Sequence, residues 1–305
     1  MVEAIAERWA QVDPEAGLTF VTNRIHSNRQ QKVYTKMLKT LAKNDGPKAY
    51  ALLLATEASN KKSVWNLGES AFEVFREWKK TSPEAAFEAI QERNIHPANA
   101  DAALYAMCRA ESASERDTVR EQVRAIEDPE LQRKAWGKVV YSWAKTASLD
   151  EVVGWMDGEG FPPETISTME REIALRKAKD HPSDMAKWLT ERASPESLPD
   201  HLETAVQVWA HAQPNACGEW LHTMELGPQT DRAVAAFTHA TIQHDVESAF
   251  SWAQSIHDNT LRQKTLGRVA HFLRRFDPDK LNHLVTTSGL DADQQARLLD
   301  RRQVN

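Results

Sequence analysis

The chain is poor in cysteine and has no excess of basic residues. Its 305 residues include only two cysteines, Cys108 and Cys217. Two thiols so far apart in sequence do not form a disulfide framework, and we expect both to be small buried side chains without a bridge. The formal net charge is −6, whereas general nucleic-acid binders show a basic balance or a basic stripe. The composition therefore disfavours nucleic acid as a partner.

Long apolar runs are also missing. No window approaches 18 consecutive apolar residues, so the sequence contains no candidate transmembrane helix. The first residues, MVEAIAERWAQVD, carry acidic side chains and lack the basic start and apolar core of a signal peptide. With 41% hydrophobic and 27% charged residues, the chain has the composition of a folded protein. These features predict a cytoplasmic location and no membrane segment.

Signatures of enzymes and metal sites are absent as well. The sequence has no G-x-S-x-G, H-E-x-x-H, Walker or G-x-G-x-x-G motif. Nine of the eleven histidines lie from His181 onward, but His239 and His244 are five residues apart, whereas zinc sites on a helix use a spacing of four. The tripeptide His201-Leu202-Glu203 is too short to indicate a site. We therefore expect a non-catalytic protein without a metal or a cofactor, and no motif identifies its binding residues.

Proline and tryptophan, by contrast, are frequent and regularly placed. None of the 13 prolines falls inside an apolar helical run, so they mark helix boundaries. Short segments recur that start with Pro, or with an apolar residue in its place, and most carry a large apolar residue six positions later. They start at Pro14, Pro47, Pro83, Leu149, Pro182, Pro214, Val246 and Pro278. The interval from Pro83 to Leu149 is about twice the usual spacing, which predicts one more, degenerate segment near Arg116. The starts then recur with a period of 32–36 residues.

Longer segments lie between these short ones and resemble one another. The segment LQRKAWGKVV at 131–140 aligns with LRQKTLGRVA at 261–270, and apolar residues recur in both with the 3.6-residue period of a helix. A Ser or Asp before a Pro predicts a helix start, because the side-chain oxygen accepts a free amide hydrogen and Pro fits the first turn. Such pairs occur at Asp13-Pro14, Ser82-Pro83, Asp128-Pro129, Ser194-Pro195 and Asp277-Pro278. We expect roughly 70% helix.

These segments predict a repeat protein. A helical hairpin of about 33 residues cannot bury its own apolar faces, whereas stacked hairpins bury them jointly. We therefore expect an all-α fold, an open right-handed superhelix (α-solenoid) of about nine antiparallel helix-turn-helix repeats, with residues 1–305 as a single continuous domain. Four tryptophans are expected in equivalent core positions, namely Trp155, Trp188, Trp220 and Trp252. The shared register of Gly137 and Gly267 predicts close approach of a neighbouring helix at both.

The pattern resembles tetratricopeptide-like α-solenoids over essentially the whole chain. It is also similar to uncharacterised bacterial helical-repeat proteins with recurring Trp-x3-Asp-Pro-x-Ala junctions, represented here at Trp9–Ala16, Trp78–Ala85 and Trp209–Ala216. The tetratricopeptide start, Trp-x2-Leu-Gly-x2-Tyr, occurs only as a fragment at 65–68. The Pro-x5-Trp spacing is also found in the helical-repeat subunit of protein prenyltransferases, but the basic residues that follow the Trp there are missing here. The resemblance to solenoids implies partner binding along a curved surface and no catalytic residue.

Three function classes follow. The leading hypothesis is a non-catalytic scaffold or adaptor that binds a protein or a peptide on its curved face. The alternatives are a helical-repeat nucleic-acid-binding protein, HEAT-like and of base-excision type, and an α/α-barrel enzyme. A basic stripe would favour nucleic acid, and Arg133, Lys134 and Lys138 share their register with Lys264 and Arg268. The nearby acids Glu127, Asp128 and Glu130 indicate an ordinary mixed surface instead.

The two ends of the sequence differ. Only about 12 residues precede Asp13, fewer than in the other long segments, and Val2, Ala4, Ile5 and Ala6 lack the polar outer face of a terminal repeat. We therefore expect the chain to have been cut from a longer one at its N-terminus, or its first helix to pair with a partner or a second copy. A targeting signal or anchor in the missing part is the alternative to a cytoplasmic location. The last segment, DADQQARLLDRRQVN, is polar apart from Leu298 and Leu299 and is typical of a terminal cap.

Overall fold

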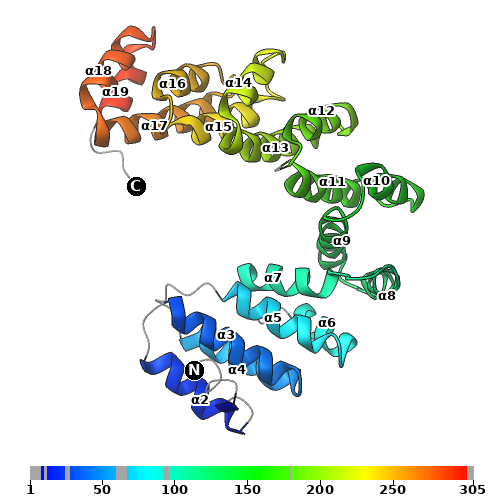
Figure 1. Ribbon diagram of the computed structural model, residues 1–305. Coiled ribbons are helices and arrows are strands. Elements are labelled where there is room, and N and C mark those ends of the chain that lie inside the picture. The colour runs from blue at the N-terminus through cyan, green and yellow to red at the C-terminus, as the bar shows by residue number, and fades with distance from the viewer. Residues whose placement is uncertain are drawn as a thin grey trace. The chain divides into compact units, whose positions relative to one another are not determined.

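The protein is all-α, as the sequence predicts. The computed structural model describes residues 8–9, 12–24, 28–59, 67–92, 96–178 and 180–300. Within these ranges it contains 18 helices and no strand, and 78% of the residues are helical (Figure 1). The apolar first residues from which we expect a truncated N-terminus lie outside the described residues, and so do the first two residues of the tetratricopeptide-like fragment at 65–68.

The helix starts follow the proline pattern. Helices begin at Pro14, Pro83, Leu149, Pro182, Pro214, Val246 and Pro278, and another begins at Gly46, one residue before Pro47. The degenerate segment near Arg116 is the helix Ala113–Arg124. Two aspartates close the first turns as expected: Asp13 accepts the amide of Ala16, and Asp128 accepts the amides of Glu130 and Leu131. The side chain of Ser82 before Pro83, by contrast, forms no such bond. These local signals place the helix boundaries without tertiary information.

The prediction of a helix start at Ser194-Pro195 is wrong. The next helix begins at Leu198, and residues 195–197 form a turn in which the Ser194 carbonyl accepts the amides of Ser197 and Leu198. A second proline, Pro199, occupies the first turn of this helix. Two prolines four residues apart both suit a first turn, and the sequence does not decide between them.

The chain divides into two compact units, residues 1–160 and 161–305. In the first unit, α3, α5, α7 and α9 pack successively on one another, and the helices between them pack on their flanks (Figure 1). The helices of this unit are α2 Pro14–Arg24, α3 Asn28–Ala42, α4 Gly46–Ser59, α5 Gly68–Trp78, α6 Pro83–Gln91, α7 Pro97–Cys108, α8 Ala113–Arg124, α9 Pro129–Trp143 and α10 Leu149–Gly158. Consecutive long helices thus share one layer, as stacked hairpins require.

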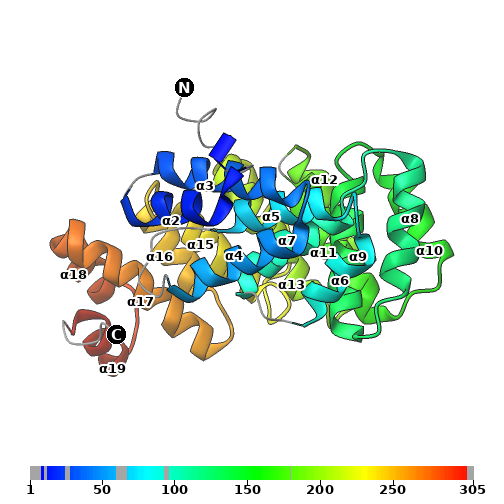
Figure 2. The same cartoon turned by 90° about the horizontal axis from the view of Figure 1, so that it is seen from below.

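The second unit repeats this arrangement. The helices α11, α13, α15 and α17 follow one another side by side, and α12, α14, α16 and α18 pack beside them (Figures 1 and 2). The bounds are α11 Pro163–Lys177, α12 Pro182–Arg192, α13 Leu198–Ala212, α14 Pro214–His222, α15 Asp231–Thr241, α16 Val246–Gln254, α17 Asn259–Phe276, α18 Pro278–Thr287 and α19 Ala292–Leu299. Leu298 and Leu299 of α19 pack against the last apolar cluster, as expected of a terminal helix.

The four tryptophans of the short helices occupy matching sequence positions but differ in burial. Each lies six residues after the first residue of α10, α12, α14 or α16. Trp155, Trp220 and Trp252 each pack on an aromatic ring of the preceding long helix, with ring centroids 5.3–5.4 Å apart. Only Trp252 is buried, at 6% exposure, whereas Trp220 packs against its apolar cluster from the edge and is partly exposed. The expectation of four equivalent core positions is therefore wrong in burial, since Trp155, Trp188 and Trp220 are only partly buried.

Gly267 lies in the interior of α17, where the shared register with Gly137 predicts a close neighbour. That prediction is wrong for Gly267, because a β-carbon placed there would meet no atom within 4 Å.

A glycine at this place destabilises the helix, because glycine costs a helix interior about 1 kcal/mol relative to alanine. We expect Gly267→Ala to raise the free energy of unfolding by about 0.5–1 kcal/mol, measured by urea denaturation. Gly46→Ala is the contrast, because its β-carbon would collide with the Trp78 ring, and it is expected to destabilise the fold.

Candidate ligand-binding cavity

Three successive long helices of the second unit line a cavity of about 550 Å³. Each helix contributes side chains spaced three or four residues apart, so that one face of each helix is turned toward the cavity. The lining is Glu203, Gln207 and His211 of α13, Arg232, Ala235, Ala236 and His239 of α15, and Leu261, Lys264, Thr265 and Arg268 of α17. The two alanines leave room in the middle of this surface, and longer polar side chains surround it.

The charges of the cavity are unevenly balanced. At one end, Arg232 forms ion pairs with Asp200 and with Glu203, the latter at 2.7 Å. At the other end, Lys264 and Arg268 are exposed, and among the described residues neither forms an ion pair with a carboxylate. The uncompensated positive charge of the cavity therefore belongs to α17.

In the first unit, the basic residues at the corresponding sequence positions do have carboxylate partners. Lys134 and Lys138 align with Lys264 and Arg268, and Lys134 pairs with Glu130 at 2.7 Å. Lys138 pairs at 3.0 Å with Asp101, which belongs to the preceding long helix, α7. In the second unit the residue that meets Arg268 from the preceding long helix is His239, not an acid. The basic stripe considered from sequence is thus neutralised at these positions of the first unit and charged in the second.

His239 holds Arg268 without cancelling its charge. The Arg268 Nη1 lies 2.6 Å from Nε2 and 2.8 Å from Nδ1 of the imidazole. A guanidinium group has only donors, so the contact needs an unprotonated ring nitrogen as acceptor. Partial burial, followed by the charges of Arg268 and Lys264, lowers the pKa of His239 to about 4. At neutral pH the ring is therefore uncharged and orients the guanidinium.

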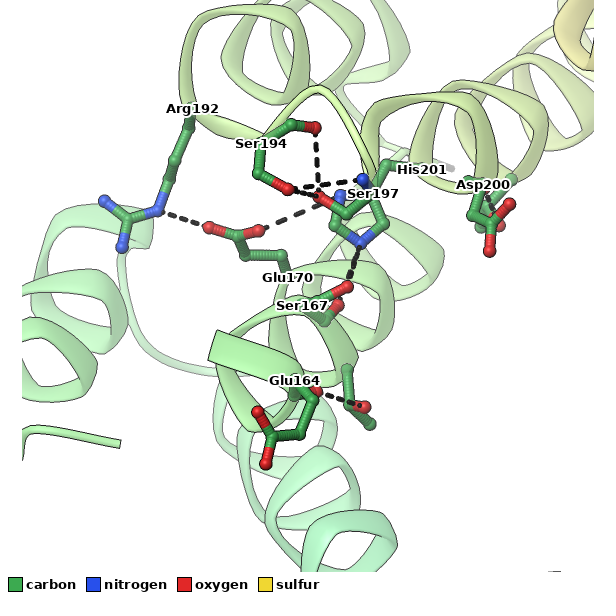
Figure 3. Close-up of polar contacts among 10 residues, drawn as sticks. Glu164, Ser167, Glu170, Arg192, Ser194, Ser197, Asp200 and His201 are labelled. Carbon is green, nitrogen blue, oxygen red and sulfur yellow. Dashed lines mark hydrogen bonds and ion pairs between the residues drawn. The ribbon is translucent and has the colours of Figure 1, made fainter. Parts of the chain in front are cut away.

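A second polar cluster connects α11, α12 and α13 (Figure 3). The His201 ring of α13 points toward α11, where its Nε2 lies 2.8 Å from the Ser167 carbonyl oxygen and 3.2 Å from the Ser167 hydroxyl. Its Nδ1 lies 3.8 Å from the Glu170 carboxylate, which also pairs with Arg192 of α12 at 2.8 Å. A serine, a histidine and a glutamate in a row are the side chains of a hydrolytic triad.

The geometry of this cluster favours a structural role. A triad needs a free Nε2 lone pair aimed at the serine hydroxyl, but the shorter contact of Nε2 is with a carbonyl oxygen, to which only an N–H can donate. Nδ1 forms no hydrogen bond with the described residues. The His201 side chain is 1% exposed, so a substrate does not reach it. The cluster therefore fixes α11, α12 and α13 to one another.

The two histidines predict how stability depends on pH. Burial lowers the pKa of His201 from its usual 6.5, against the effect of its bond to Ser167, and the pKa of His239 is lowered as well. Both groups then bind more protons in the unfolded chain, so the stability is complete above about pH 6.5 and falls as the pH decreases toward the folded values. We expect a lower urea midpoint at about pH 5 than at about pH 7.5, and a smaller difference in His201→Gln and His239→Gln. Equal differences in parent and variants would contradict this assignment.

The two cysteines and the metal-ligating side chains form no further candidate site among the described residues. Both cysteines are free and buried, as predicted, and burial raises the pKa of each thiol to about 12. Within the described part of the chain, no group of three or more His, Cys, Asp or Glu side chains is placed to hold a metal ion. None of the described helices is both long and apolar enough to cross a membrane.

Comparison with known proteins adds no assignment. The chain matches no protein family, no curated protein and no solved structure. The likeness to tetratricopeptide proteins therefore rests on the sequence pattern and on the helical fold.

Proposed function

We propose that the protein is a non-catalytic scaffold that binds a protein or a peptide along its layer of long helices. In this proposal the hairpins stack into an open right-handed superhelix of about nine repeats, similar to tetratricopeptide-like solenoids, and the protein acts in the cytoplasm. Stacked hairpins present an extended surface built from side chains of many repeats, which suits a partner in an extended conformation.

The observation that carries the proposal is the cavity shared by α13, α15 and α17. Side chains from three successive long helices line it, and most of its polar groups are exposed. Its volume of about 550 Å³ falls in the range of about 300–1,000 Å³ that is usual for ligand pockets. A cavity that crosses several repeats accommodates successive side chains of one bound segment.

The enzyme alternative has less support. In the cluster of Ser167, His201 and Glu170, Nε2 of the histidine carries a hydrogen and so cannot accept the serine proton. The histidine side chain is also closed to solvent. The nucleic-acid alternative is favoured by a single observation, that Lys264 and Arg268 have no acidic partner in the described part of the chain, but the acidic Glu203 lies at the other end of the same cavity. We retain it as an outcome of the test.

The test is a selection from a random peptide library displayed on phage, with the intact protein immobilised. Enrichment of a shared motif, and one-to-one binding of a synthetic peptide with that motif, would support the proposal. No enrichment, together with DNA binding that weakens steeply with salt, would replace it by the nucleic-acid alternative. Low-angle scattering tests the architecture separately, since a superhelix is elongated and a closed α/α-barrel is compact.

A further inference from the structure

We propose that the cavity of α13, α15 and α17 binds an acidic peptide segment, with Lys264 and Arg268 pairing with a carboxylate of that segment. This inference rests on the proposed function, because it specifies the chemistry of the partner.

The first argument is the charge. Both cations at the corresponding register of the first unit have a carboxylate of their own, Glu130 for the exposed Lys134 and Asp101 for the more buried Lys138. Lys264 and Arg268 have none among the described residues, although both line one cavity. A carboxylate brought by a partner would supply the missing charge, and it would meet two donors on adjacent turns of one helix.

The second argument is the orientation of Arg268. His239 accepts from one guanidinium nitrogen, Nη1, and no other side-chain hydrogen bond of Arg268 is formed with the described residues. A guanidinium group carries five N–H donors in a planar fork, which suits bidentate pairing with a carboxylate. An aspartate at the place of His239 would neutralise this fork. The neutral imidazole positions it and leaves its charge available.

The third argument concerns the number of free cations in the cavity and the acidic residues at its opposite end. A protein that binds double-stranded DNA typically contacts about 6–10 phosphates, whereas this cavity offers two uncompensated cations. Asp200 and Glu203, paired with Arg232, would repel a continuous polyanion at the opposite end. Leu261, Ala235 and Ala236 provide apolar surface between the two ends. A segment with one or two acidic side chains and apolar neighbours fits both features.

Fluorescence anisotropy with a fluorescein-labelled hexaglutamate peptide tests the inference on the full chain. We expect saturable binding that weakens as salt is added. Arg268→Gln is expected to weaken the affinity about tenfold, as for the loss of a hydrogen bond to a charged group, and Lys264→Gln to weaken it in the same direction. Lys134→Gln is the matched control, because it removes the same charge at the same register of the first unit, and it should leave the affinity unchanged.

Different results would overturn the acidic-peptide inference and the proposed function. Equal loss in Lys134→Gln and Lys264→Gln, or a labelled oligothymidine of equal length that binds more tightly than hexaglutamate, would overturn the acidic-peptide assignment. If the display selection enriches neutral peptides whose binding is unchanged in Arg268→Gln, this inference fails and the proposed function stands. If neither hexaglutamate nor any displayed peptide binds, both fail. Both α17 side chains are exposed, and a thermal melt of each variant shows that its fold is intact.

Discussion

Replacing Trp209 by alanine is expected to lower the free energy of unfolding by about 3–5 kcal/mol, the usual cost of removing a buried aromatic side chain. Trp209 is 3% exposed and belongs to the apolar cluster that joins α13, α14 and α15. Its indole packs on Trp220 with ring centroids 5.4 Å apart, and its Nε1 donates to Gln213 at 3.3 Å. Alanine would leave a cavity at the junction of these helices. Urea denaturation followed by circular dichroism measures the loss.

Trp220 provides the matched control, because the two rings touch each other but differ in burial. Trp220 is partly exposed and packs on the cluster from its edge. Trp220→Ala removes less buried surface and lets water into the space, so we expect a loss of about 1–2 kcal/mol. Equal losses in the two variants would mean that burial does not determine the cost here.

The helices could be predicted from the sequence because their signals are local. A proline, a side-chain acceptor before it and an apolar period of 3.6 residues act within one or two turns. Where two local signals compete, as at Pro195 and Pro199, the prediction fails. The burial of Trp220 and the space around Gly267 could not be predicted either, since both depend on how neighbouring hairpins pack.

The cavity could be predicted only in part. The register of Lys264 and Arg268 is visible in the sequence, but their lack of acidic partners depends on which residue the preceding long helix places opposite them. That residue is His239 in one unit and Asp101 in the other. The cluster around His201 was missed for the same reason, because Ser167 lies 34 residues away and no motif links them. His239 and Arg268 are 29 residues apart, and Ser167 and His201 are 34 residues apart, so comparing positions separated by about one predicted period would have suggested the second contact but not the first.

Asp231 is the residue whose loss should most affect the geometry of the cavity. Its side chain is buried at the start of α15 and accepts two backbone amides from the connection before α17, that of His257 at 2.8 Å and that of Asp258 at 2.7 Å. Asp258 in turn accepts the amide of Leu261 and closes the first turn of α17. One carboxylate thus connects the start of α15 to the start of the helix that carries Lys264 and Arg268.

Asp231→Ala is therefore expected to lower the free energy of unfolding by about 2–4 kcal/mol, because it removes two hydrogen bonds to a charged acceptor. Asp231→Asn keeps one acceptor oxygen and should lose less. At a temperature where Asp231→Ala remains folded, its affinity for hexaglutamate should also fall, since the first turn of α17 is no longer held against α15. Unchanged stability in Asp231→Ala would show that the connection is held by other contacts. A stability loss with unchanged peptide affinity would show instead that α17 keeps its place without this carboxylate, because the packing of α15 against α17 alone would then set the positions of Lys264 and Arg268.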